Sequence, residues 1–204
     1  MKFIIEHLED SLDDWSTLEY LNIFNHVGPG SLILSGLTPT LASHLPDRIA
    51  QVAIETTTRG IQEICEKKEY GLTANRVLLL DPASKVPLSP SDAAHFDALL
   101  FGGILGDDPP RDRTSELRIL GFETRHLGPV QMTTDTACLV AQRVTRDQEP
   151  LESIPFVDRP ELRMSKKEVV QMPFRYMVDL KTNAPKLPPG MMQLLRDSND
   201  LPLN

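Results

Sequence analysis

The stretch LLFGGILGDDPPRDRT, residues 99–114, decides the fold of this 204-residue chain. It begins inside an apolar run, residues 97–105, which is typical of a strand buried on both faces. It then breaks into glycines and releases three aspartates, two prolines and two arginines without starting a helix. A buried strand that ends this way predicts a parallel sheet whose backbone closely approaches a ligand beyond the strand's carboxyl end.

The rest of the chain indicates a mixed α/β fold. Helical spacing predicts one helix from Ser11 to Val27, with Ser11 and Asp14 as a capping box, and another that begins at Thr133 or Thr134. The helical signal over residues 47–70 is interrupted at residues 55–58, which are either a strand end or a helix break. Apolar runs predict strands over residues 2–7, 31–37, 76–81 and 97–105, and a further short strand is expected over residues 123–127.

The character of the sequence changes after Gln148, where prolines become frequent. One apolar run in this tail, residues 169–180, predicts a single edge strand. We therefore expect one domain over residues 1–204, with residues 149–204 as a C-terminal extension packed on it.

Composition and charge limit the classes of function. The formal net charge is −8, so the protein is expected to favour a cationic partner over a polyanion such as nucleic acid, unless the charge only maintains solubility. No apolar run is long enough to span a membrane, and the first residues do not resemble a signal peptide. Cys65 and Cys138 suggest small core residues in a reducing compartment. These features together predict a cytoplasmic protein.

Two glycine-containing loops, residues 101–114 and 126–137, leave strands that are expected to be neighbours. Ligands of open parallel sheets bind beyond the carboxyl ends of the strands. Neither loop carries a dinucleotide fingerprint or a P-loop, and their acids would repel a polyphosphate. A ligand that carries positive charge, such as S-adenosylmethionine (SAM), suits these loops better, although glycines in ordinary turns would give a similar pattern.

Five motifs carry a resemblance to a known family. They are IIEHLED (4–10), LLDP (79–82), FGGILGDDPPRDRT (101–114), QMTTDTA (131–137) and MPFRY (172–176). In this order they resemble the SPOUT-superfamily protein-arginine methyltransferases known from yeast, over nearly the whole chain. The resemblance implies an α/β fold with a SPOUT-type trefoil knot around a mostly parallel sheet. It also implies a monomeric, SAM-dependent enzyme that monomethylates an arginine of a small-subunit ribosomal protein.

The same resemblance implies where the methyl donor binds, namely in the loops that form the knot. The donor-binding residues expected on this basis are Leu80, Asp81, Phe101, Gly102, Gly103, Gly106, Leu127, Gly128, Gln131, Met132, Thr133, Thr134 and Thr136.

Methyl transfer to arginine needs carboxylates, because the guanidinium is protonated and must be oriented and then lose a proton. The candidates are Glu6 at the end of the first strand, and Asp107 and Asp112 in the acidic loop. Glu6 could equally be a solvated strand-end acid, and Asp112 could instead pair with Arg111 or Arg113 to hold the loop.

Other polar residues near the motifs are more ambiguous. Asp135 has equal claims as a helix cap and as a site residue, while Arg175 and Tyr176 suit packing of the tail better than a substrate wall. No metal site is expected, since histidines and cysteines never fall at ligand spacing. Two rival functions remain at this point, an RNA methyltransferase of the same superfamily and a non-catalytic binding module on the ribosome.

Overall fold

A six-stranded parallel sheet forms the centre of the protein in this computed structural model, which describes residues 1–103, 112, 114–165 and 169–199. The strands lie in the order β3-β2-β1-β5-β4-β6, and each neighbouring pair is parallel. Their bounds are β1 (Lys2–Glu6), β2 (Leu32–Ser35), β3 (Glu55–Thr56), β4 (Val77–Leu80), β5 (Ala98–Gly102) and β6 (Glu123–Arg125). The predicted α/β fold with a mostly parallel sheet is confirmed, while the knot stays a prediction.

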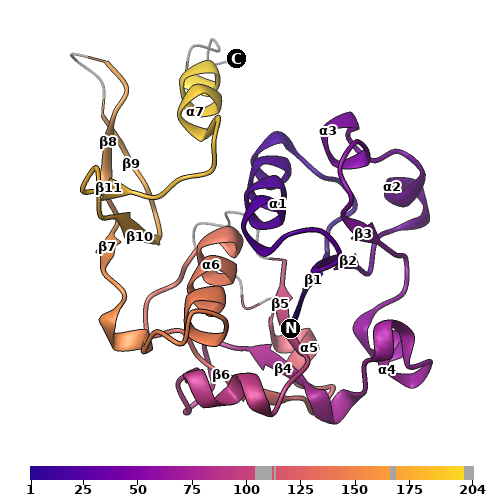
Figure 1. The fold of residues 1–204 in the computed structure, drawn as a ribbon. Coiled ribbons are helices and arrows are strands. Elements are labelled where there is room, and N and C mark those ends of the chain that lie inside the picture. The colour runs from indigo at the N-terminus through magenta and orange to yellow at the C-terminus, as the bar shows by residue number, and fades with distance from the viewer. Residues whose placement is uncertain (104–111, 113, 166–168, 200–204) are drawn as a thin grey trace.

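Helices cover both faces of this sheet, which explains why its strands are apolar at consecutive positions (Figure 1). Side chains such as Phe3 and Ile5 pack with α1 and α6 on one face, whereas Ile4 and Leu79 pack with α4 and α5 on the other. The bounds are α1 (Asp14–Val27), α2 (Pro39–Ser43), α3 (Asp47–Ala50), α4 (Ile61–Glu66), α5 (Thr114–Arg118) and α6 (Thr134–Thr145), with 3-10 helices η1 (Glu69–Gly71), η2 (Ala74–Arg76), η3 (Pro90–Ala94) and η4 (Leu151–Ser153).

The ends of the elements differ from the sequence predictions in a few places. The predicted capping box at Ser11 is wrong, because Asp13 caps α1 by accepting the N–H of Ser16 at 2.8 Å. The ambiguous residues 55–58 begin with a strand, β3, that extends the sheet beside β2. Thr133 is the N-cap of α6, which was one of the two predicted starts.

The C-terminal extension is more elaborate than the single predicted edge strand. Pro173 interrupts the apolar run 169–180, so the run forms two separate strands. The elements of the extension are a sheet of β7 (Phe156–Asp158), β10 (Arg175–Asp179) and β11 (Ala184–Pro185), a hairpin of β8 (Glu161–Arg163) and β9 (Val169–Gln171), and α7 (Met191–Asn199).

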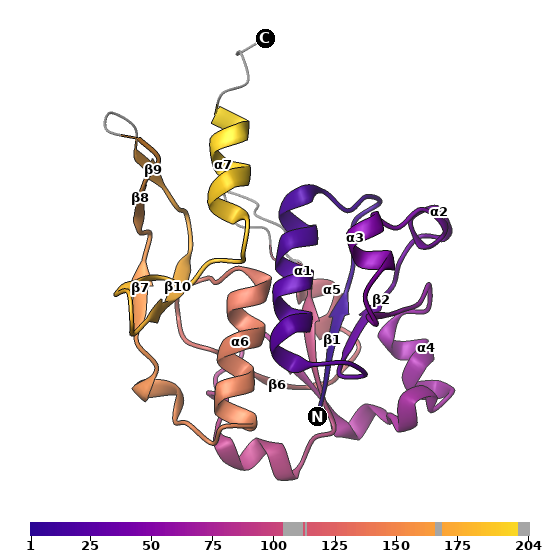
Figure 2. The ribbon, with the colours of Figure 1, turned by 45° about the horizontal axis from the view of Figure 1, so that its top comes forward.

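This extension has an apolar cluster of its own, built around Met172, Phe174 and Tyr176. Trp15 of α1 packs against that cluster, and Figures 1 and 2 show the extension standing beside α1 and α6 at the edge of the central layers. Its division from the rest, as residues 149–204 of a single domain over residues 1–204, remains a proposal.

No helix in the described part of the chain is long and apolar enough to cross a membrane.

Candidate active site

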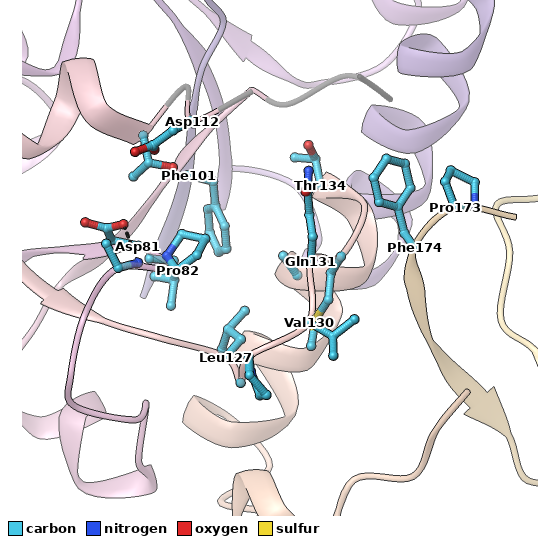
Figure 3. A pocket seen from close by; sticks show the side chains of 18 of the residues that line it. Asp81, Pro82, Phe101, Asp112, Leu127, Val130, Gln131, Thr134, Pro173 and Phe174 are labelled. Carbon is cyan, nitrogen blue, oxygen red and sulfur yellow. Dashed lines mark hydrogen bonds between the residues drawn. The ribbon is translucent and has the colours of Figure 1, made fainter. Parts of the chain in front are cut away.

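A cavity of about 700 Å³ opens where β4 and β5 end, at the edge of the sheet that faces the extension (Figure 3). It is bounded by the segment after β4, the end of β5 with the start of α5, the loop that leads into α6, and the extension. The predicted donor residues that line it are Leu80, Asp81, Phe101, Gly102, Leu127, Gly128, Gln131, Met132 and Thr134. Three segments far apart in the sequence therefore meet as the motifs suggested.

Other predicted donor residues lie behind the cavity wall. The N–H of Gly103 donates to the carbonyl of Glu6 at 2.9 Å, and a Cβ at this position would lie 3.0 Å from that oxygen. This glycine thus allows the chain to pass close to β1. The Thr133 hydroxyl donates to Asp135 at 2.7 Å and lies 2.8 Å from the hydroxyl of Thr136, which can donate to it in turn, so these residues hold the start of α6. Gly106 falls outside the described residues.

Sequence reasoning missed part of the wall. The extension contributes Arg159, Pro173 and Phe174, and Figure 3 shows Pro173 and Phe174 across the cavity from Asp81. The remaining unpredicted lining residues are Pro82, Ala83, Thr114, Arg118, Pro129, Val130 and Ala137. Pro173 and Phe174 belong to the MPFRY motif, which was a signal that could have placed them here.

Arg118 ties together two carboxylates at one end of the cavity. It forms a bidentate ion pair with Asp81, with N–O distances of 2.5 and 2.8 Å, and it also contacts Asp112 at 3.1 and 3.2 Å. Burial alone would raise the pKa of Asp81, but the Arg118 guanidinium and the N–H of Ala83 lower it below its ordinary value. One alternative for Asp112 was an ion pair that holds the loop. Asp112 does form such a pair, but its partner is Arg118 and not the predicted Arg111 or Arg113. Arg111 and Arg113 are outside the described residues.

Glu6, the first catalytic candidate, is not in the cavity wall. Its side chain is buried, and its carboxylate accepts the hydroxyl of Ser35 at 2.5 Å and the N–H of Ile61 at 3.1 Å. Burial raises the pKa of this carboxyl, and these two hydrogen bonds oppose the rise. Glu6 therefore caps the first turn of α4, and a catalytic role for it stays a prediction. Asp107 lies outside the described residues.

Asp135 belongs to a buried polar cluster between α1 and α6. Its carboxylate accepts Asn22 Nδ2 at 2.8 Å, and its N–H donates to Glu19 at 3.3 Å. Burial raises the pKa of both carboxyls, and for Glu19 the charge of Asp135 adds to the rise. Neither side chain lines the cavity, so the geometry favours the capping role that was one of the two alternatives for Asp135.

Arg175 and Tyr176 also lie outside the cavity wall. Arg175 forms a bidentate ion pair with Asp158 at 2.6 and 2.9 Å, and Tyr176 is buried in the apolar cluster of the extension. Both positions agree with packing of the tail. In the described part of the chain, no group of three or more histidines, cysteines, aspartates or glutamates is arranged to hold a metal ion.

Comparison with known proteins identifies the family. A family model described as "Protein arginine N-methyltransferase SFM1-like" matches residues 2–201, nearly the whole chain. The chain belongs to the SFM1-like protein arginine N-methyltransferases. The resemblance drawn from the five motifs is thereby confirmed.

Individual members of the SFM1-like family are similar over the same range. Protein arginine N-methyltransferase SFM1 of Saccharomyces cerevisiae is 44% identical over 202 residues, which cover 96% of this chain and 94% of the yeast protein. The structure of the yeast enzyme complexed with SAM has a TM-score of 0.91 at 41% identity, covering 98% of this chain and 92% of that one. Its complex with MTA has a TM-score of 0.86 at 41% identity, covering 96% and 100%.

The cavity of this SFM1-like chain suits an adenine nucleoside, which SAM and MTA both contain. Its volume falls in the range of about 300–1,000 Å³ that is usual for small-molecule sites. Its wall is largely apolar, with Phe101, Leu127 and Val130 able to cover a flat ring. Gln131 lines the cavity, and its buried Nε2 has no hydrogen-bond partner among the described residues.

Proposed function

We propose that this protein transfers a methyl group from SAM to an arginine of a small-subunit ribosomal protein. The observation that carries the proposal is the cavity at the ends of β4 and β5, which gathers four of the five family motifs in one wall. We further propose that the enzyme acts as a monomer in the cytoplasm and adds one methyl group.

The residues of the cavity wall would hold the donor, which supplies an electrophilic methyl group when bound. Alignment of two reactants can lower a barrier by roughly 7–11 kcal/mol, so positioning is the main task of the protein. The apolar side chains Phe101 and Leu127 would cover the adenine. Gly102 presents backbone to the cavity, where a larger side chain would take up space.

The acceptor requires a different set of groups. A guanidinium has a pKa above about 12, so it reaches the site protonated and must lose a proton as its nitrogen is methylated. A carboxylate next to the donor can pair with two guanidinium N–H groups, direct the third nitrogen to the methyl group and take up the proton. Of the three candidate carboxylates we favour Asp107 for this role. The other two are engaged elsewhere, because Asp112 is bonded to Arg118 and Glu6 caps α4.

The charge of the protein favours a basic protein substrate over RNA. With a formal net charge of −8, long-range attraction acts on a cationic protein, while a polyanion is repelled. An RNA methyltransferase and a non-catalytic ribosome-binding module are the two competing functions.

A transfer assay with labelled SAM separates these functions. Purified small-subunit ribosomal proteins, ribosomal RNA and tRNA would be offered in parallel to the wild type and to Asp107→Ala and Asp147→Ala variants. Asp147 is the matched control, because it is exposed and follows α6 at the end remote from Thr134.

We expect label on one protein, at least 100-fold less of it with Asp107→Ala and no change with Asp147→Ala, in line with the ~10²–10⁴-fold contribution of general acid–base groups. Mass spectrometry of the labelled arginine then counts the methyl groups. Label confined to RNA would overturn the substrate. Donor binding with no labelled product in any fraction would favour the binding module.

A further inference from the structure

The cavity wall contains four charged side chains, and three of them are paired with one another. Arg118 bridges Asp81 and Asp112, as described above, so its guanidinium is occupied by two carboxylates. The fourth is Arg159, which comes from the turn between β7 and β8 in the extension. It adds a second positive charge to a cavity wall whose other charged groups are all paired with one another.

The Arg159 guanidinium is unbonded among the described residues. In the described part of the chain it forms neither a side-chain hydrogen bond nor an ion pair. The adjacent carboxylate, Asp158, is held by the bidentate ion pair with Arg175. The guanidinium carbon of Arg175 in turn lies 5.0 Å from the centroid of the Phe156 ring. Asp158 acts on Arg159 only through space. The guanidinium is therefore available to an anion that enters the cavity.

The backbone fixes Arg159 at this place. Its φ is 47°, a left-handed conformation that is unfavourable for a residue with a Cβ and is often found at ligand sites. Its N–H donates to the carbonyl of Phe174 at 2.9 Å, and the N–H of Met172 donates to the carbonyl of Pro160 at 2.9 Å. These bonds join the turn to the segment that supplies Phe174 to the same wall.

We propose that Arg159 binds the carboxylate at the methionine end of the methyl donor. This inference rests on the proposed function, since it assigns one end of the ligand that the cavity is proposed to hold. A planar guanidinium pairs well with a carboxylate through two N–H groups, and such charge-assisted bonds are stronger than neutral ones. The extension would thus supply a specificity contact for the amino-acid part of the donor, while the loops of the main sheet hold the nucleoside part.

Calorimetric titration with three ligands tests the assignment without measuring activity. SAM and its product S-adenosylhomocysteine carry the carboxylate, whereas MTA, 5′-methylthioadenosine, has the same nucleoside and lacks the amino acid. The variants are Arg159→Gln, which keeps length and removes charge, and Arg159→Lys, which keeps charge. Arg163→Gln is the matched control, because Arg163 is an exposed arginine of β8 in the same extension and does not line the cavity.

We expect Arg159→Gln to weaken binding of SAM and S-adenosylhomocysteine by about 10- to 100-fold, as the loss of a charge-assisted hydrogen bond does, and to change MTA binding less than about twofold. Arg159→Lys should recover part of the loss, and Arg163→Gln should bind all three ligands as the wild type does. Melting temperatures show that each variant is folded.

Two results would overturn the assignment. Equal weakening of all three ligands by Arg159→Gln would mean that the cavity itself is disturbed, and unchanged binding of all three would mean that the carboxylate lies elsewhere. Failure of the wild type to bind any of the ligands would instead refute the proposed function. Tight binding of SAM without methylation of protein would refute only the catalytic proposal and leave the Arg159 contact standing.

Discussion

Replacement of Arg118 by methionine removes the cation that joins two walls of the cavity. Methionine keeps a long apolar side chain at the position, so the change is mainly one of charge and hydrogen bonding. In the native protein the Arg118 guanidinium pairs with Asp81, whose side chain is 2% exposed, and with Asp112, whose side chain is 58% exposed. The variant leaves the Asp81 carboxylate without its ion-pair partner.

The magnitude follows from the burial of Asp81. Loss of one partner of a fully buried ion pair costs about 3–5 kcal/mol of unfolding free energy. The Asp81 carboxylate retains the N–H of Ala83 at 2.9 Å and faces a cavity, so the lower figure of about 2–3 kcal/mol is expected. The exposed contact with Asp112 adds less than about 1 kcal/mol. For a chain of this length the total of about 2–4 kcal/mol lowers the melting temperature by roughly 4–16 °C.

The pH dependence identifies the cause. The folded pKa of Asp81 lies below its ordinary value, so the pair stabilises the protein above pH ~4 and loses its effect as pH falls through the folded pKa. Urea unfolding of wild type and Arg118→Met should therefore differ most near pH 7 and converge in acid. Asp112→Asn, as control, should change stability by less than about 1 kcal/mol. A difference below about 0.5 kcal/mol at pH 7, or one that persists unchanged in acid, would refute this account.

Two further changes test buried polar groups. Glu6→Gln keeps an oxygen that can accept the N–H of Ile61. It removes a carboxyl whose pKa is raised by burial. Because the pKa is higher in the folded state, the wild type becomes less stable as pH rises from ~4.5 through the folded pKa. The variant should gain stability on the wild type between pH 4 and 8 in urea unfolding, and loss of methyl transfer by the folded variant would restore Glu6 as a catalytic candidate. The Tyr176 hydroxyl is buried and has no hydrogen-bond partner among the described residues, so Tyr176→Phe should be neutral or stabilising by up to about 1–3 kcal/mol in thermal unfolding. A loss of more than 1 kcal/mol would show that the hydroxyl is hydrogen-bonded.

The sequence alone predicted five of the six strands of the sheet and much of the cavity. Apolar runs such as Val77–Leu80 mark strands buried on both faces, and parallel strands bring their carboxyl ends to one edge. Gly102 at the end of β5 and Asp81 directly after β4 therefore reach the cavity. These predictions hold because each depends on a short, continuous segment.

The contribution of the extension could not be predicted in the same way. Arg159 and Phe174 reach the cavity only because two short segments, separated in the sequence, bond through the backbone and pack beside α1 and α6. Strands of three residues are too brief to show an alternating pattern. The ion pair of Arg118 with Asp81 likewise joins positions 37 residues apart, and no periodicity reports such a contact.

The contrast between Asp81 and Glu6 shows what decides the role of an acid at a strand end. Glu6 is the last residue of a parallel strand and Asp81 is the first residue after one, and both are buried. Asp81 follows β4, where α5 brings Arg118 and the cavity opens, whereas Glu6 ends β1 beneath the connection from β3 to α4. At that connection a Cβ on Gly60 would lie 2.8 Å from Glu6 Oε1, so the glycine leaves room for the carboxylate against the N-terminus of α4. The crossover above each strand, rather than the acidic residue itself, therefore determines whether the carboxylate faces the cavity or supports the fold.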